Sequence, residues 1–245
     1  MIGSGLLVAA FLLGLPGLLG PGGPQDTADK PGSPPAVSRE QAREKVEGVL
    51  RALDEKQKGL KDLEAEFVQT QVIHLLKEPD VSRGLLYWKE GKLRMDWTEP
   101  SRSVLVLDEK GILLHVPEEK RAERFPAGEN ENFGALFPGF GQTSDEMKKT
   151  YEIELMTGPK DAKTWHLRFR PRRKKMRRWV GRIGLWVDRE KGVPVRLRLV
   201  DPNGKDYTEL VLSKTKVNQG IKKERFMLDL PEGTKVSTPP GGLPF

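Results

Sequence analysis

Histidine offers the most versatile acid–base chemistry in a protein, and this chain of 245 residues has three, His74, His115 and His166. They lie far apart in the sequence, and none belongs to an HExxH motif or to any other metal-binding spacing. Each falls inside a pattern typical of a β-strand, which favours an edge or outward-facing position in a sheet. We therefore do not expect any of them to act as a catalytic base.

Other catalytic signatures are also missing from the sequence. There is no GxSxG nucleophile elbow, no phosphate-binding P-loop and no dinucleotide-binding fingerprint. The carboxylates fall in solvated, lysine-rich runs such as Glu118-Glu119-Lys120. The absence of cysteine excludes disulfides, thiolate zinc sites, cysteine nucleophiles and the lipid-modified cysteine of a lipoprotein. The sequence thus predicts a binding protein rather than an enzyme, with no cofactor and no metal.

The strongest concentration of charge lies in residues 168–182, where nine of the fifteen residues are basic, in a chain whose formal net charge is +7. Charge at this density is either solvated or paired with anions. Three interpretations stay open: a nucleic-acid backbone site with Trp179 as a stacking aromatic, a loop that contacts anionic lipid headgroups or a protein partner, and a solvated hairpin loop. The candidates for anionic contact are Arg172, Arg173, Lys174, Lys175, Arg177 and Arg178.

The N-terminal region has the composition of a targeting segment. Residues 6–19 form an apolar run of 14 residues, interrupted by glycine and proline, which suits the apolar region of an export signal better than a membrane span. An uncleaved anchor and a disordered apolar tail are the alternatives. We expect a signal peptide at 1–20, a Pro/Gly-rich linker at 21–37, one folded domain at 38–236 and a flexible tail at 237–245. Export would exclude nucleic acid as a partner.

Strict alternation of apolar and charged residues marks the strands that would carry the domain. It occurs in residues 93–97 and returns in residues 165–170 and 195–199. Alternation of this kind is typical of a strand with one face against an apolar interior and the other in water. A single antiparallel sheet, apolar on one side, explains all three segments. Its apolar side covers either an ordinary core or a cavity for an apolar ligand.

The remaining elements follow in an order that predicts a β-meander after one helix. Ser38 opens a capping box with Gln41, and apolar residues at helical spacing continue to about Gly59. Residues 118–131 look irregular, Ser144 is expected to cap a short helix, and residues 226–233 close the domain. Strands are predicted at 67–73, 83–90, 93–97, 103–107, 112–116, 151–156, 165–170, 183–188, 193–200 and 207–213.

Residues 132–140 concentrate three phenylalanines among glycines and a proline. This composition does not suit a strand, and exposure of the aromatic side chains to water would be unfavourable. We expect the segment to lie over something apolar, either as a loop packed on the core or as a mobile lid. The lid candidates are Phe133, Leu136, Phe137 and Phe140.

The order of short motifs resembles the LolA-like family of periplasmic outer-membrane lipoprotein carriers, from about Val46 to Val236. The motifs are AEFVQT from Ala65, WKEGKLRMDWTEP from Trp88, LVLDEKG from Leu105, LVDPNG from Leu199 and FMLDLPEG from Phe226. The resemblance implies a mainly β, α+β fold: an incomplete antiparallel β-barrel, or strongly curved sheet, with an N-terminal helix and short helices over its concave apolar face. It also implies a periplasmic, monomeric carrier of acyl chains, with an inner-membrane releasing complex and an outer-membrane acceptor as possible partners.

The cavity predicted by this resemblance would be lined by the large apolar residues of the helix and of the alternating strands. They are Val49, Leu53, Phe67, Trp88, Leu93, Met95, Trp97, Trp165, Leu167, Phe169, Val195, Leu197 and Leu199. The chain departs from the family at one turn: well-studied members carry an Arg-Pro pair tied to lid control and onward transfer, and here Lys89-Glu90-Gly91 follows Trp88. Lys89 and Arg94 are the candidate substitutes. The alternative function is a non-transporting envelope module that uses residues 168–182.

Overall fold

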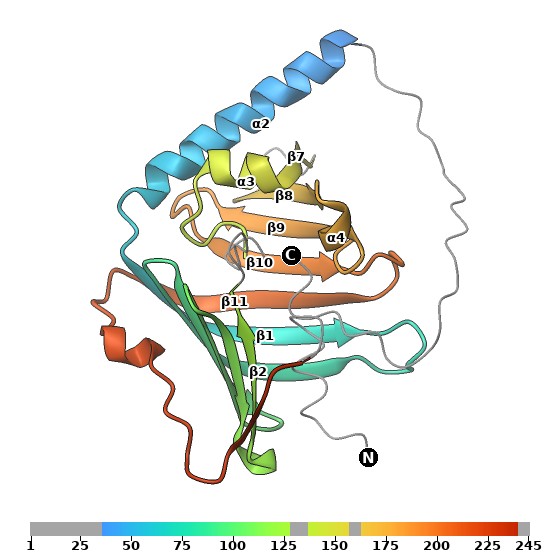
Figure 1. Cartoon of the computed structure of the whole chain (residues 1–245). Coiled ribbons are helices and arrows are strands. Elements are labelled where there is room, and N and C mark those ends of the chain that lie inside the picture. The colour runs from blue at the N-terminus through green and yellow to red at the C-terminus, as the bar shows by residue number, and fades with distance from the viewer. Residues whose placement is uncertain (1–35, 128–136, 157–162, 240–245) are drawn as a thin grey trace.

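The computed structural model describes residues 36–127, 137–156 and 163–239. They form one 12-stranded sheet in the order β12-β6-β5-β4-β3-β2-β1-β11-β10-β9-β8-β7, which is open because its two edge strands do not pair with each other. The sheet is strongly curved, with helices against one side (Figure 1). The predicted mainly β, incompletely closed fold is confirmed. Within the described ranges, no helix is long and apolar enough to cross a membrane.

One half of the sheet is the predicted meander. It consists of β1 (Asp62–Val72), β2 (Asp80–Lys89), β3 (Lys92–Glu99), β4 (Ser103–Asp108), β5 (Gly111–Val116) and β6 (Arg121–Pro126), each antiparallel to the next. Between β2 and β3, Glu90 and Gly91 both have positive φ, +47° and +80°. Two positive φ values in a two-residue turn match the right-handed twist of a tight hairpin, as the sequence predicted.

Strand β6 corrects the prediction that residues 118–131 are irregular. In β6, Glu123 pairs with Leu114 and Phe125 pairs with Ile112, so the side chains of both β6 residues share the face of the apolar cluster. Of the three β6 residues on this face, Arg121, Glu123 and Phe125, only Phe125 is apolar. The other two form an ion pair with each other. The strand therefore lacks the apolar alternation by which the other strands were found.

The other half of the sheet comes later in the chain. It contains β7 (Tyr151–Leu155), β8 (Thr164–Pro171), β9 (Arg182–Asp188), β10 (Pro194–Val200) and β11 (Tyr207–Val217). Strand β11 joins the halves, because it pairs antiparallel with β1 from Val72 opposite Tyr207 to Leu63 opposite Val217. The two longest strands thus form the middle of the sheet.

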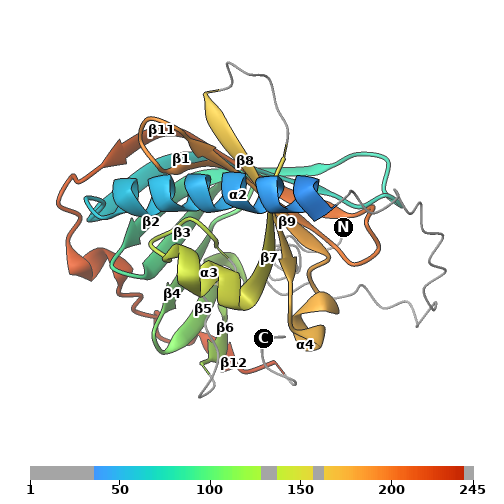
Figure 2. The same ribbon diagram turned by 90° about the horizontal axis from the view of Figure 1, so that it is seen from above.

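The described residues contain three α-helices beside the sheet. Helix α2 (Ala36–Gln57) begins two residues before the predicted Ser38, and α3 (Ser144–Thr150) is capped by Thr143 rather than by Ser144. The Thr143 hydroxyl accepts the Glu146 N–H while the Glu146 carboxylate accepts the Thr143 N–H, which is a complete capping box. Helix α4 (Lys174–Arg177) lies within the basic segment predicted as a loop. Figure 2 shows α2 and α3 on the same side of the sheet.

The C-terminal segment contains a strand that the sequence did not predict, after residues 226–233, which were expected to close the domain. It forms the 3₁₀ helix η3 (Lys223–Phe226) and then β12 (Lys235–Ser237), which pairs in parallel with β6. Its path over the outer side of the sheet is fixed by Asp62, which is 2 % exposed and accepts backbone N–H groups of Gln219, Gly220 and Ile221. Figure 1 shows this segment in red beside the meander.

Candidate functional site

The concave side of the sheet carries a continuous apolar cluster to which both halves contribute. Nine of the predicted lining residues are buried in it: Leu53, Phe67, Trp88, Leu93, Met95, Trp97, Leu167, Phe169 and Leu197. Val49, Trp165 and Leu199 are half-buried and pack against the cluster. Val195 is outside it, because a β-bulge between Pro194 and Arg196 interrupts the alternation, and Val193 is the buried residue there.

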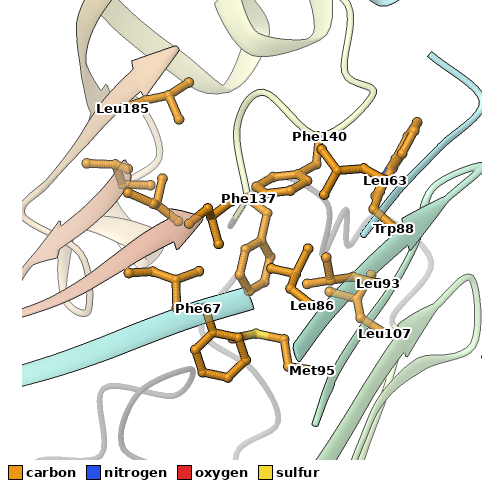
Figure 3. Packing of buried hydrophobic residues seen from close by; sticks show 14 of the residues in the cluster. Leu63, Phe67, Leu86, Trp88, Leu93, Met95, Leu107, Phe137, Phe140 and Leu185 are labelled. Atoms are coloured by element: carbon orange, nitrogen blue, oxygen red, sulfur yellow. The ribbon is translucent and has the colours of Figure 1, made fainter. Parts of the chain in front are cut away.

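Two of the predicted lid residues fill the middle of this concave side. We call residues Phe137–Gln142 the plug loop. Phe137 and Phe140 are 3 % and 6 % exposed and pack edge to face with ring centroids 6.3 Å apart. Figure 3 shows both rings among side chains of β2, β3 and β9. Phe133 and Leu136 lie outside the described residues.

Two glycines let the backbone of the plug loop approach both halves of the sheet. A Cβ on Gly141 would lie 2.2 Å from Trp88 on β2, and one on Gly139 would lie 3.0 Å from Leu185 on β9. Both glycines also have positive φ, +74° and +90°. The loop therefore bridges the two sheet halves at a distance that only glycine allows.

Polar contacts from helix α2 hold the plug loop and the helix that follows it. The Gln57 side-chain amide donates to the carbonyls of Gly139, at 2.7 Å, and of Gly192, at 3.3 Å. Asp54 accepts the Ser144 backbone N–H at 2.8 Å. These contacts connect the loop to one helix end by a few hydrogen bonds, each of modest net strength, rather than by a large interface.

The apolar side contains few polar groups. The Trp97 indole N–H donates to the Gln69 side-chain oxygen at 3.0 Å, which satisfies both groups inside the sheet. Gln142, at the end of the plug loop, is 8 % exposed, and among the described residues its side-chain nitrogen has no hydrogen-bond partner. Burial raises the pKa of Tyr151, which packs edge to face on Phe169 at 5.5 Å. The described residues of this surface are therefore mainly apolar.

The three histidines are dispersed, and His115 and His166 lie in strands as predicted, but His74 lies in the turn after β1 rather than in a strand. The His74 ring contacts the Asp206 carboxylate at 2.6 Å, and His115 lies buried on the outer face of β5, where burial lowers its pKa. The His166 ring stacks on Trp186 at 4.0 Å, and burial, together with the nearby arginines, lowers the pKa of His166. Within the described ranges, no group of three or more histidine or carboxylate side chains could hold a metal ion.

The basic segment turns Met176 and Val180 inward and most of its charges outward. Met176 is 2 % exposed within the apolar cluster, whereas Arg173, Lys174, Lys175, Arg177 and Arg178 are exposed. Arg172 lies nearer the sheet, where it pairs with Glu152 at 3.7 Å and donates to two backbone carbonyls. The buried methionine is the feature that the interpretation of the segment as a charged loop misses.

The candidate substitutes for the Arg-Pro pair point away from the plug loop. Lys89 donates to the Ile221 carbonyl, and Arg94 pairs with Asp96 at 2.7 Å and donates to the Arg225 carbonyl. Both therefore hold the C-terminal segment on the outer face. A pocket of about 480 Å³ opens there, with mixed polar and apolar walls formed by Glu64, Tyr87, Arg94, Gln219, Ile221, Lys222, Glu224 and Arg225.

The fold and this site define a class of protein: one open, strongly curved sheet whose apolar concave side is covered by helices and a phenylalanine-bearing loop. The chain matches the family model of the outer membrane lipoprotein carrier protein LolA over residues 58–229. It belongs to that family, and the predicted family relationship is confirmed.

Solved structures are similar to this chain at low sequence identity. An uncharacterized conserved protein from Thermus thermophilus is 12 % identical, with a TM-score of 0.50 over 80 % of this chain and 99 % of that one. A LolA superfamily protein from Nitrosomonas europaea is 11 % identical, with a TM-score of 0.41 over 74 % of this chain and 97 % of that one. Lipoprotein LppX from Mycobacterium tuberculosis is 10 % identical, with a TM-score of 0.38 over 71 % and 96 %. No curated protein matches the sequence.

Proposed function

We propose that this protein is a periplasmic carrier that binds the acyl chains of a lipoprotein or related lipid on the concave side of its sheet. The observation that carries the proposal is the plug loop, in which Phe137 and Phe140 lie buried between the two sheet halves. An acyl chain would take the place of these rings on the same apolar side chains. The structure then corresponds to the closed, lipid-free state.

Competition between the plug loop and the ligand gives an affinity suited to a carrier. Burial of an acyl chain of about 16 carbons contributes roughly 12 kcal/mol at about 0.8 kcal/mol per CH₂. Displacement of Phe137 and Phe140 costs about 1.5–3 kcal/mol for each ring. The remaining 6–9 kcal/mol, roughly, corresponds to a Kd of about 0.3 to 40 µM. A ligand with this binding free energy can be released, whereas a ligand bound by roughly 12 kcal/mol would be retained.

Transfer in one direction requires something besides an apolar binding surface. In this chain the turn after Trp88 is Lys89-Glu90-Gly91, and the Lys89 side chain donates a hydrogen bond to the Ile221 carbonyl of the C-terminal segment. The proposed carrier therefore lacks the Arg-Pro device of well-studied relatives, and we expect release to be controlled by the plug loop and its contact with Gln57.

Binding of a fluorescent fatty acid, displaced by palmitate, tests the proposal. We expect saturable binding to the wild-type chain and loss of binding in Leu210→Glu, since Leu210 is 1 % exposed within the cluster. The matched control is Val211→Glu, the next residue in β11, which is 40 % exposed on the other face and should leave binding unchanged.

A second variant serves if Leu210→Glu does not fold. Gln57→Ala removes the hydrogen bond to Gly139 without a change in the apolar cluster, and it should tighten binding up to about tenfold, since one hydrogen bond contributes about 0.5–1.5 kcal/mol. Absence of saturable binding in the wild-type chain, or equal loss in both glutamate variants, would reject the carrier proposal.

A further inference from the structure

Two adjacent leucines project into solvent at the tip of the β1–β2 loop. Leu75 and Leu76 are 72 % and 55 % exposed, whereas most other large apolar side chains of the described residues are buried. Single exposed leucines are ordinary on protein surfaces, but two neighbours at a loop tip form a small apolar projection. The conformation is supported from below, because Asp206 accepts the His74 backbone N–H at 2.8 Å and also contacts the His74 ring.

The basic surface of α4 is fixed in place by what lies beneath it. Met176 and Val180 lie in the apolar cluster and are 2 % and 6 % exposed. A rotation that turned the charges of the segment inward would expose these two apolar side chains to water. Among the described residues, no ion pair is made by Arg173, Lys174 or Arg178. The first turn of α4 contains no acidic residue. The result is a cationic surface that is held outward by buried residues beneath it.

Strand register places these two features at the same end of the sheet. Val72 lies opposite Tyr207, Tyr207 opposite Val200, and Val200 opposite Arg182. Residue 72 leads into the leucine loop, and residue 182 follows the α4 segment. Three strand spacings separate these two points, which is about 14 Å. Figures 1 and 2 both show α4 and the β1–β2 loop at this end.

We propose that this end of the sheet docks on the surface of a bilayer containing anionic phospholipid. Leu75 and Leu76 enter the interface between headgroups and acyl chains, while Arg173, Lys174, Lys175, Arg177 and Arg178 contact the negatively charged headgroups. An apolar side chain that inserts, next to cations that contact headgroups, is the combination by which peripheral proteins bind membranes. A polynucleotide or an acidic protein would use the cations but leave the leucines without a role. The inference does not depend on lipid carriage.

The absence of cysteine allows a local test in the full chain. In Leu75→Cys, labelled with an environment-sensitive dye, emission should shift to the blue on vesicles of phosphatidylcholine with phosphatidylglycerol and stay unchanged on phosphatidylcholine alone. Lys110→Cys is the control, because the β4–β5 turn lies at the opposite end of the sheet, where Asp62 pairs with Lys89 and Asp108 with Gly111. Its dye should report water on both vesicles.

Replacement of Arg173, Lys174, Arg177 and Arg178 by glutamine tests the cationic half. The vesicle affinity should fall about fivefold for each cation removed, and so at least about a hundredfold for the four. The charge-matched control replaces Lys92, Lys110, Lys222 and Lys223, which lie towards the other end, where Lys223 pairs with Glu90 and Lys92 with Glu109. An equal blue shift from both labelled positions, no shift at position 75, or equal loss of affinity in the two charge variants would overturn the proposal.

Discussion

Replacement of Phe140 by alanine tests whether its ring is a plug that the ligand displaces or an ordinary core residue. Phe140 is 6 % exposed and contacts Phe137 in the middle of the concave side. The loss of this ring should lower the free energy of unfolding, as the loss of any buried phenylalanine does. If the ring also occupies the ligand's place, the same variant should bind acyl chains more tightly, because less apolar burial has to be given up when the loop opens.

The magnitude follows from the ring's burial. Complete burial of a phenylalanine contributes about 1.5–3 kcal/mol, so Phe140→Ala should tighten palmitate binding by roughly 10- to 150-fold. In chemical denaturation, the same variant should have a free energy of unfolding about 3 kcal/mol or more below that of the wild-type chain. Stability and affinity therefore move in opposite directions, which does not happen when a binding surface is merely damaged.

The assay is displacement of a fluorescent fatty acid, with urea denaturation run on the same samples. Phe226→Ala is the matched control, because Phe226 is also 6 % exposed but belongs to η3 on the C-terminal segment. It should lose stability and keep the wild-type affinity. If Phe140→Ala weakened acyl binding, or left it unchanged while stability fell, the ring would be part of a permanent core and the plug would not exist.

Two further predictions concern stability. Asp62→Ala leaves the backbone N–H groups of Gln219, Gly220 and Ile221 without their acceptor. It should lower the free energy of unfolding by about 2–4 kcal/mol, as measured by denaturation, and expose the C-terminal segment to protease in limited digestion. An unchanged digestion pattern would contradict this anchoring role. Burial, and to a lesser degree Asp206, raises the pKa of Asp201 to about 6, above the unfolded value of 3.8. The contribution of Asp201 to the stability of the folded state is therefore complete below the unfolded pKa and is lost as pH rises through 6. Asp201→Asn should therefore raise the melting temperature at pH 7.5 and have little effect at pH 3.5, and an equal effect at both pH values would refute the raised pKa.

Alternation along single strands was sufficient to predict most of the sheet. Strands β3 and β8 were predicted correctly because one of their faces meets the apolar cluster and the other is charged. The same reasoning missed β6, where Arg121 and Glu123 sit on the cluster face as an ion pair, and β12, whose parallel pairing depends on where the C-terminal segment is anchored. Both depend on partners distant in the sequence.

The sequence likewise predicted part of the candidate site but not all of it. Three phenylalanines among glycines indicated a segment that covers apolar surface, and Phe137 and Phe140 do lie on the cluster. The position of Val195 was not predictable, since a β-bulge changes which residues face inward without a signal in the apolar pattern. Nor could the sequence place the Leu75 loop at the same end of the sheet as α4, because that placement arises from the register of four strands.

Identification of lipid that co-purifies with the full chain from its native cells tests the central claim most directly. Mass spectrometry after gentle extraction should detect acyl lipid in a fixed ratio to the wild-type protein, less of it in Leu210→Glu, and an unchanged amount in Val211→Glu. Wild-type protein that carries no acyl lipid, or the same lipid content in all three chains, would contradict the account that the concave side of this sheet receives acyl chains.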